Sequence, residues 1–146
     1  MIDLSDRVGQ ELGVGEWMEV AQARVDAFAD ATDDHQWIHE AGDRAAAGPF
    51  GGPIAHGFLT LSLLTPLTTG ILRPHTEGAR MAINYGLDRV RFITPVRVGS
   101  RIRARVKLVE VKPIQGGVQL KIETTIEIEG TERPAAVVEN LVRLYG

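Results

Sequence analysis

The sequence predicts an α+β fold in which an antiparallel sheet wraps around one long, buried helix. Residues 80–146 read as strand almost throughout, with apolar and polar side chains in alternation. Residues 56–69 form a helix-like stretch with leucines on several faces and no Asp, Glu, Lys or Arg. A helix that is apolar nearly all round is a buried one. The length of 146 residues suits one domain, residues 1–146, with one hydrophobic core.

The first half of the chain is expected to hold the helices and most of the loops. A short strand is predicted over Glu16–Val20, and a helix over Gln22–Thr32, where apolar residues recur at helical spacing. Residues 33–56 are rich in Gly, Pro, Asp and His and should be mostly loop, with a short helix around Asp43–Ala47. Pro66 should kink or end the buried helix, because proline lacks a backbone N–H.

Four strand candidates follow in the second half of the chain. They are Met81–Tyr85 with Arg89–Thr94 as its continuation or neighbour, Arg101–Val111, Gly117–Glu129, and Ala135–Tyr145. In the second candidate four basic side chains share one face: Arg101, Arg103, Arg105 and Lys107. We favour a solvated strand face for these residues, since alternation alone predicts it. The alternative is a patch that binds phosphate groups.

Composition narrows the class of protein. Hydrophobic residues make up 44% and charged residues 24%, and the formal net charge is -3. No basic footprint for nucleic acid is present, and no apolar run approaches the roughly 20 residues of a membrane span. The N-terminal residues lack the basic and apolar regions of a signal peptide, so we expect a cytoplasmic protein. The absence of cysteine excludes disulfides, thiolate zinc sites and a Cys nucleophile.

Residues with chemical potential concentrate in two segments, 33–39 and 48–58. These segments contain three of the four histidines, an acidic pair and four glycines. Asp34 and His39 are five positions apart in an expected loop, so both side chains could hold one water and move its proton. Gly57 lies where the buried helix should begin, and a free backbone N–H there would stabilise an oxyanion. These groups suffice to add water to a double bond conjugated to a carbonyl.

Other interpretations of these residues exist. An Asp and a His in a polar loop are often surface or capping residues. His35 and His39 have the four-residue spacing of a helical metal pair, but Gln36 stands where a glutamate would follow the first histidine. Ser62 lacks the Gly-x-Ser-x-Gly context of a serine nucleophile.

Two motifs resemble those of a known family. Phe28–His39, read as FADATDDHQWIH, and Phe50–Leu59, read as FGGPIAHGFL, are similar to the hydratase 2 motif of MaoC-like dehydratases, which include the R-specific enoyl-CoA hydratases. The amino-acid sequence of the first motif resembles that of the nodulation protein N-like branch, which also contains mycobacterial 3-hydroxyacyl-thioester dehydratases. The resemblance runs from about Gly13 to the C-terminus, through Asn84-Tyr85-Gly86.

The resemblance implies a hot-dog fold and a homodimer. We expect no cofactor and no metal. The resemblance also implies reversible hydration of trans-2-enoyl thioesters to (R)-3-hydroxyacyl thioesters, with an acyl thioester of CoA or of acyl carrier protein as substrate. Asp34 and His39 match the catalytic dyad, and Gly57 matches the residue whose N–H binds the thioester oxygen. His56 and Gln36 match neighbouring substrate-binding positions. Ser62 or Thr65 matches a hydroxyl that orients the aspartate.

One departure from the family concerns substrate range. Gln36-Trp37 stands where the wider family has Asn-Pro. Two alternative functions share the fold: an acyl-CoA thioesterase and a non-catalytic acyl-thioester binder. Acyl chain length, direction, carrier and pathway are not determined by the sequence.

Overall fold

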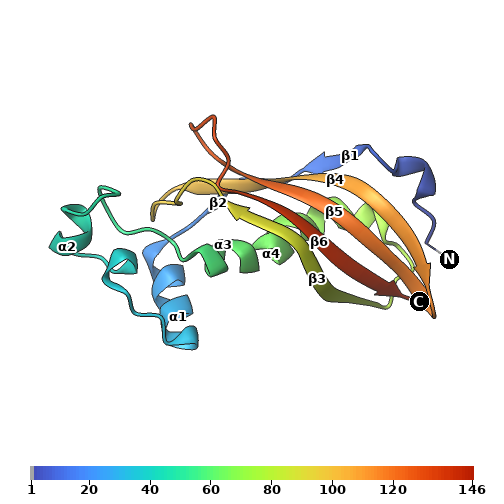
Figure 1. The fold of residues 1–146 in the computed structure, drawn as a ribbon, viewed down its shortest axis with the longest axis horizontal. Coiled ribbons are helices and arrows are strands. Elements are labelled where there is room, and N and C mark those ends of the chain that lie inside the picture. The colour runs from blue at the N-terminus through green and yellow to red at the C-terminus, as the bar shows by residue number, and fades with distance from the viewer. Residues whose placement is uncertain (1) are drawn as a thin grey trace.

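The protein, described over residues 2–146 by a computed structural model, consists of one curved sheet and a set of helices on its concave side (Figure 1). The strands are β1 (Glu11–Val14), β2 (Met18–Glu19), β3 (Met81–Phe92), β4 (Arg101–Ile114), β5 (Gly117–Ile128) and β6 (Ala136–Tyr145). The helices are α1 (Gln22–Thr32), α2 (Asp43–Ala46), α3 (Gly57–Ser62) and α4 (Leu64–Leu72). Short 3-10 turns lie at Ser5–Arg7, Trp37–His39 and Arg73–His75. The predicted α+β class is confirmed.

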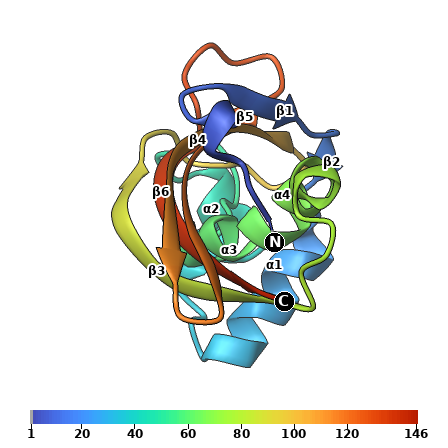
Figure 2. The same ribbon diagram turned by 90° about the vertical axis from the view of Figure 1, so that its right-hand side faces the viewer.

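The sheet is antiparallel throughout and curls around α3 and α4 (Figure 2). Its order is β1-β4-β5-β6-β3, with β2 paired to β4. On β4 and β5 the alternation of the sequence is the alternation of burial, and the inner faces form the core with the helices. The fully buried members of these faces are Ile102, Ala104, Val106, Leu108, Ile122, Thr124 and Ile126.

Most predicted elements lie where the sequence places them. Helix α1 has the predicted bounds, and α2 covers four of the five residues expected. The two segments around Tyr85 and Arg89 form one strand, β3, whose register against β6 shifts twice. The strand expected at Glu16–Val20 shortens to Met18–Glu19.

Strand β1 was not predicted, because it has only four residues and contains Gly13, with Gly15 directly after its end. Both glycines are required for packing. A Cβ added to Gly15 would lie 2.9 Å from the carbonyl oxygen of Leu67, and one added to Gly13 would lie 3.0 Å from Ile71. Glycine therefore allows this part of the chain to lie directly on α4, a requirement that no strand pattern reveals.

The central helix differs from the prediction in two ways. It is divided at Leu63 into α3 and α4, three residues before Pro66, consistent with the clash between a proline ring and the carbonyl four residues earlier. The expectation of burial nearly all round was wrong, because the sheet covers one side only. On the other side Phe58, Ser62, Thr65 and Thr69 are exposed. None of the helices in residues 2–146 is long and apolar enough to cross a membrane.

The basic face of β4 is balanced by carboxylates on neighbouring strands. Arg101 pairs with Glu129, Arg103 with Glu127, and Arg105 with both Glu11 and Glu127. The hydrogen bond with Glu11 is the main cause that raises the pKa of Arg105. These three arginines already have anionic partners, which favours the solvated face over the phosphate patch. Exposed pairs of this kind add little stability.

Two glycine-to-alanine changes should have opposite effects on folding. Gly15→Ala should lower the free energy of unfolding by about 1–3 kcal/mol, because its Cβ meets the Leu67 backbone. Gly70→Ala lies inside α4 with open space around its Cβ and should raise that free energy by about 0.5–1 kcal/mol. Urea denaturation at equal protein concentration measures both. Equal effects of the two changes would contradict the close packing of β1 on α4.

Candidate active site

Asp34 is placed by the way α1 ends. Asp33 adopts the left-handed conformation (φ 58°, ψ 27°), which Asp tolerates better than most residues. The backbone N–H of Asp34 then donates to the carbonyl of Ala29 at 3.2 Å. This turn directs the chain away from the helix axis and leaves the Asp34 side chain exposed. Its Oδ1 accepts the backbone N–H of Gln36 at 3.4 Å.

His39 is brought back toward Asp34 by a single 3-10 turn. Its N–H donates to the carbonyl of Gln36 at 3.1 Å, which closes the turn between the two dyad positions. The His39 side chain is 6% exposed, and its Nδ1 lies 2.7 Å from the carbonyl oxygen of Ile54. Since a carbonyl only accepts, Nδ1 carries the proton and Nε2 presents a lone pair. His39 therefore has the tautomer that a general base requires.

The same two segments are joined again through the backbone. The N–H of Ile54 donates to the carbonyl of Ile38 at 2.9 Å, beside the His39 bond. Ala55 continues the contact by donating to Val96 at 2.8 Å. The loop with Asp34 and His39 is thereby fixed to the segment that enters α3, and this segment is fixed to the chain after β3.

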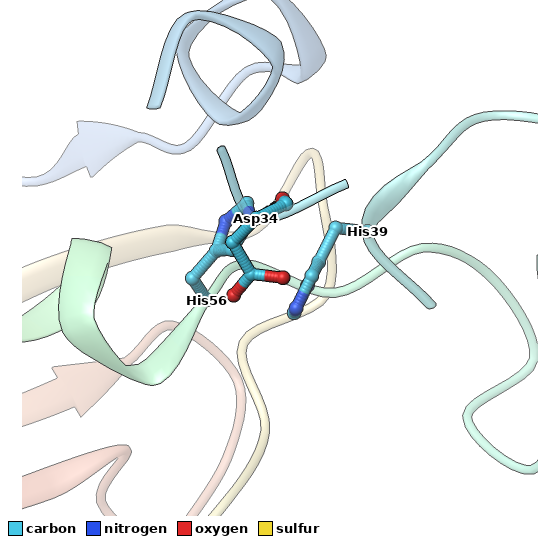
Figure 3. Close-up of side chains that lie close together, drawn as sticks. All are labelled: Asp34, His39 and His56. Carbon is cyan, nitrogen blue, oxygen red and sulfur yellow. Dashed lines mark hydrogen bonds between the residues drawn. The ribbon is translucent and has the colours of Figure 1, made fainter. Parts of the chain in front are cut away.

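His56 lies beside His39 and completes a compact group of three side chains (Figure 3). The two imidazole rings stack with centroids 3.7 Å apart and planes 23° apart, and Phe28 packs on His56 at 4.9 Å. The Nε2–H of His56 donates to the backbone carbonyl of Asp34 at 3.0 Å. Its Nδ1 is buried without a hydrogen-bond partner among residues 2–146.

The group could in principle offer three ligands to a metal ion. Asp34, His39 and His56 each have one ligand atom, and these atoms lie within 4.8 Å of one another. One ring nitrogen of each histidine is already bonded to a backbone carbonyl and the two rings stack, whereas a zinc ligand set converges tetrahedrally on the metal. The histidine pair considered from the sequence does not form, because His35 contacts Asp30 at 3.5 Å on the surface. The geometry favours acid–base chemistry over metal binding.

The remaining residues predicted for the site lie along the start of the central helix. Gly57 is the first residue of α3, so its N–H precedes the first helical bond, from Thr60 to the carbonyl of His56. Gln36 is exposed, and its backbone contacts Asp34 and His39. The Ser62 hydroxyl donates to the Phe58 carbonyl at 2.7 Å, and Thr65 is exposed one turn further along.

Two cavities flank these residues. A smaller one of about 200 Å³ is lined by Asp34, His39 and residues of α1. A larger one of about 570 Å³ lies between the uncovered side of α3 and α4 and the inner faces of β3 and β6, and Ser62 and Thr65 line it. Sequence reasoning missed the stacking of His56 on His39 and the bond from His39 to Ile54. Both join residues about 15 positions apart, and no local pattern signals such contacts.

The fold and this group together define a class of protein: a hot-dog domain fold with an aspartate–histidine site at the entrance to its central helix. The chain belongs to the MaoC-like family, because the MaoC-like domain model matches residues 3–131. The hot-dog fold expected from the sequence is confirmed by a solved structure, the (R)-hydratase from A. caviae involved in PHA biosynthesis. That structure has a TM-score of 0.76 and 28% identity, over 97% of this chain and 99% of that chain.

Two curated relatives match over nearly the whole chain. The 3-hydroxyacyl-thioester dehydratase Z of Mycobacterium tuberculosis is 50% identical, covering 97% of this chain and 93% of its own length. Nodulation protein N of Rhizobium leguminosarum bv. viciae is 51% identical, covering 92% and 84%. These relatives support a dehydratase or hydratase, and they confirm the family resemblance noted in the sequence.

A matched pair of histidine variants tests the geometry around His56. His56→Phe keeps a stacked ring but removes the bond to the Asp34 carbonyl, so the free energy of unfolding should fall by about 0.5–1.5 kcal/mol. His35→Phe makes the same chemical change at an exposed position and should alter stability by less than about 0.5 kcal/mol. Urea denaturation followed by circular dichroism measures both. A loss as large at His35 as at His56 would contradict this arrangement.

Proposed function

We propose that the protein catalyses the reversible hydration of trans-2-enoyl thioesters to (R)-3-hydroxyacyl thioesters, using Asp34 and His39 as its acid–base pair. The observation that supports this most directly is the fixed tautomer of His39. The Ile54 carbonyl holds the proton on Nδ1, and the Asp34 carboxylate lies beside the free Nε2. A water held between these two groups could lose a proton to one of them as its oxygen attacks.

The proposed acid–base pair accounts for every atom and proton that the hydration moves. The water oxygen forms a bond to the β-carbon of the enoyl group, and the double-bond electrons move toward the thioester carbonyl. The water proton passes to the dyad, and the dyad returns one proton to the α-carbon. In the reverse direction the same groups remove that proton and release the hydroxyl as water. The sum is the addition of one water, and no cofactor enters the equation.

Gly57 is proposed to stabilise the negative charge that develops on the thioester oxygen. Its N–H lies at the start of α3, next to the buried His56. A Cβ at this position would lie 3.2 Å from the ring of Phe92, so glycine allows the backbone of residue 57 to pack closely against that ring. A fixed donor at such a position is typically worth about 10²–10³ in rate.

His56 is proposed as a positioning residue. Its ring is 2% exposed, so its effect on a substrate must pass through the groups it contacts. It stacks against the His39 ring and donates one hydrogen bond to the backbone carbonyl of Asp34. For Ser62 and Thr65, the proposed role in orienting the aspartate stays a prediction, because the Ser62 hydroxyl donates within its own helix.

The dyad assignment predicts loss of activity without loss of folding. Asp34→Asn and His39→Gln keep approximate size but remove proton transfer, so each should reduce the hydration rate of crotonyl-CoA by about 10²–10⁴-fold. Loss of enoyl absorbance measures the rate, and circular dichroism verifies the fold. His35→Gln, on the exposed side of the same loop, is the matched control and should retain normal turnover.

The same assay separates the alternative functions. A thioesterase would release free thiol from crotonyl-CoA while the enoyl group persists, and a non-catalytic binder would change neither signal. Hydration removes the enoyl absorbance and releases no thiol. Near-normal hydration by the Asp34 or the His39 variant would refute the dyad even if the protein is a hydratase.

We further propose that the protein is a homodimer joined through β3. This strand pairs with β6 on one side only, and most of its side chains are exposed. Large apolar side chains gather there: Met81, Ile83, Tyr85, Leu87 and Phe92, with Phe58 of α3 nearby at 70% exposure. A long apolar edge strand of this kind requires cover, and a second copy would provide it.

Light scattering of a charged variant tests this interface. The parent should have twice the 15.9 kDa mass of one chain. Ile83→Asp should shift the mass to that of one chain at micromolar concentration, because it buries a charge in the proposed interface. Val8→Asp is the matched control, since Val8 is 44% exposed and Ile83 is 43% exposed. A monomeric parent, or equal disruption by both variants, would contradict the proposal.

A further inference from the structure

The cavity of about 570 Å³ runs along the uncovered side of the central helix. It begins at Leu61 and Ser62, one helical turn beyond Gly57, and extends to Arg73 after the end of α4. If Gly57 holds the thioester oxygen, the acyl chain enters this cavity. This step, and the inference that follows, rest on the proposed function.

The helix side of the cavity contains hydroxyl groups that need no ligand. Thr68 donates to the carbonyl of Leu64 at 2.7 Å, and Thr69 donates to that of Thr65 at 2.6 Å. Such bonds to the preceding turn are a common way for a helical threonine to satisfy its hydroxyl. These residues are consistent with an ordinary hydrocarbon-binding wall.

The sheet side contains an amide where the strand pattern requires an aliphatic residue. Asn140 lies on the inner face of β6, with Val138 and Val142 two positions away on either side. Its cross-strand neighbours are Ile122 on β5 and Leu87 on β3. An amide among such residues is unfavourable unless it is hydrogen-bonded.

Asn140 forms a hydrogen bond through the oxygen of its side-chain amide. The hydroxyl of Thr124, which is fully buried, donates to the Oδ1 of Asn140 at 3.3 Å. This bond leaves the two N–H donors on Nδ2, and Asn140 lines the cavity. Thr124 is itself a second polar residue on an otherwise aliphatic inner face of β5. The pair therefore resembles a supported donor site more than an isolated defect.

A second amide reaches the same cavity from the next strand. Asn84 of β3 lies opposite Val142 of β6, and the register of β3 shifts immediately after it. Such a shift redirects the side chains around it. Asn84 and Asn140 are both uncharged, and together they offer donors and acceptors to a neutral oxygen. A carboxylate would instead favour the guanidinium of Arg73, which also lines the cavity, whereas the cross-strand neighbours of Asn140 are aliphatic.

We propose that this cavity selects acyl chains that carry a neutral oxygen, as a hydroxyl or a keto group, bound by Asn140 with Asn84 beside it. A plain alkyl chain leaves the Asn140 donors unpaired, whereas an oxygen at the matching carbon accepts from them. Asn140 is then a specificity-determining residue, separate from the dyad that performs the reaction.

The test compares chains of equal length. The substrates are trans-2-decenoyl-CoA and analogues with one hydroxyl, one keto or one terminal carboxylate group, the first two at successive carbons beyond the double bond. The parent protein should turn over at least one hydroxyl or keto analogue with a kcat/KM about tenfold above that of the plain chain. Asn140→Leu should reverse this preference, since leucine matches its aliphatic neighbours. Asn84→Leu, at an exposed strand position, should weaken the preference without affecting the core.

Crotonyl-CoA serves as the control substrate, because its short chain ends before the cavity. The Asn140→Leu variant should turn over crotonyl-CoA at the rate of the parent. If the parent does not hydrate crotonyl-CoA, the proposed function is refuted, independently of the inference about Asn140. Dissociation constants of the saturated acyl-CoA analogues, measured by calorimetry, give the same comparison without catalysis. A preference for the plain or the carboxylate chain, or equal effects of Asn140→Leu on all chains, would overturn the inference.

Discussion

The hydrogen bond from His39 to the carbonyl of Ile54 is the interaction on which the rest of the site depends. It fixes the proton on Nδ1, and it joins the loop after α1 to the segment that enters α3. The reverse bond, from the N–H of Ile54 to Ile38, makes this junction two-sided. Together with the bond from His56 to the Asp34 carbonyl, the His39 bond sets the position of Asp34 and His39 relative to the start of α3.

The one-sided wrapping of the sheet is the second constraint. Strands β4 and β5 bury one face against α3 and α4, which supplies the core. The opposite side of the helix is left to a cavity, and the edge of β3 is left without a neighbouring strand. We propose different roles for the cavity and for the free edge of β3. The cavity receives the acyl chain, and the edge strand receives a second copy of the protein.

Polar residues on the sheet have two kinds of environment, the outer face and the inner face, which the amino-acid composition alone does not distinguish. On the outer face of β4, Arg101, Arg103 and Arg105 pair with glutamates in water, so they have little effect on stability. On the inner face, Thr124 and Asn140 interrupt an aliphatic surface and bond each other. A partly buried amide on an aliphatic cavity wall is more informative about function than several exposed charges.

The sequence by itself determined most of the elements and the family. Alternation identified β4, β5 and β6, helical spacing identified α1, and the motifs around Asp34, His39 and Gly57 identified the family. Periodicity reports which face of an element is apolar, because that pattern is local. It does not report what covers the face, so the exposed sides of α3, α4 and β3 were not foreseen.

Only the tertiary structure decided the contacts that join distant segments. The stacking of His56 on His39, the bond to Ile54 and the approach of Gly15 to Leu67 each depend on how separate elements pack. The aliphatic neighbours of Asn140 lie on three strands, β3, β5 and β6, and the amide became notable only once their register was known. Local residue patterns set the faces of strands and helices, whereas the meeting of those faces is a property of the folded chain.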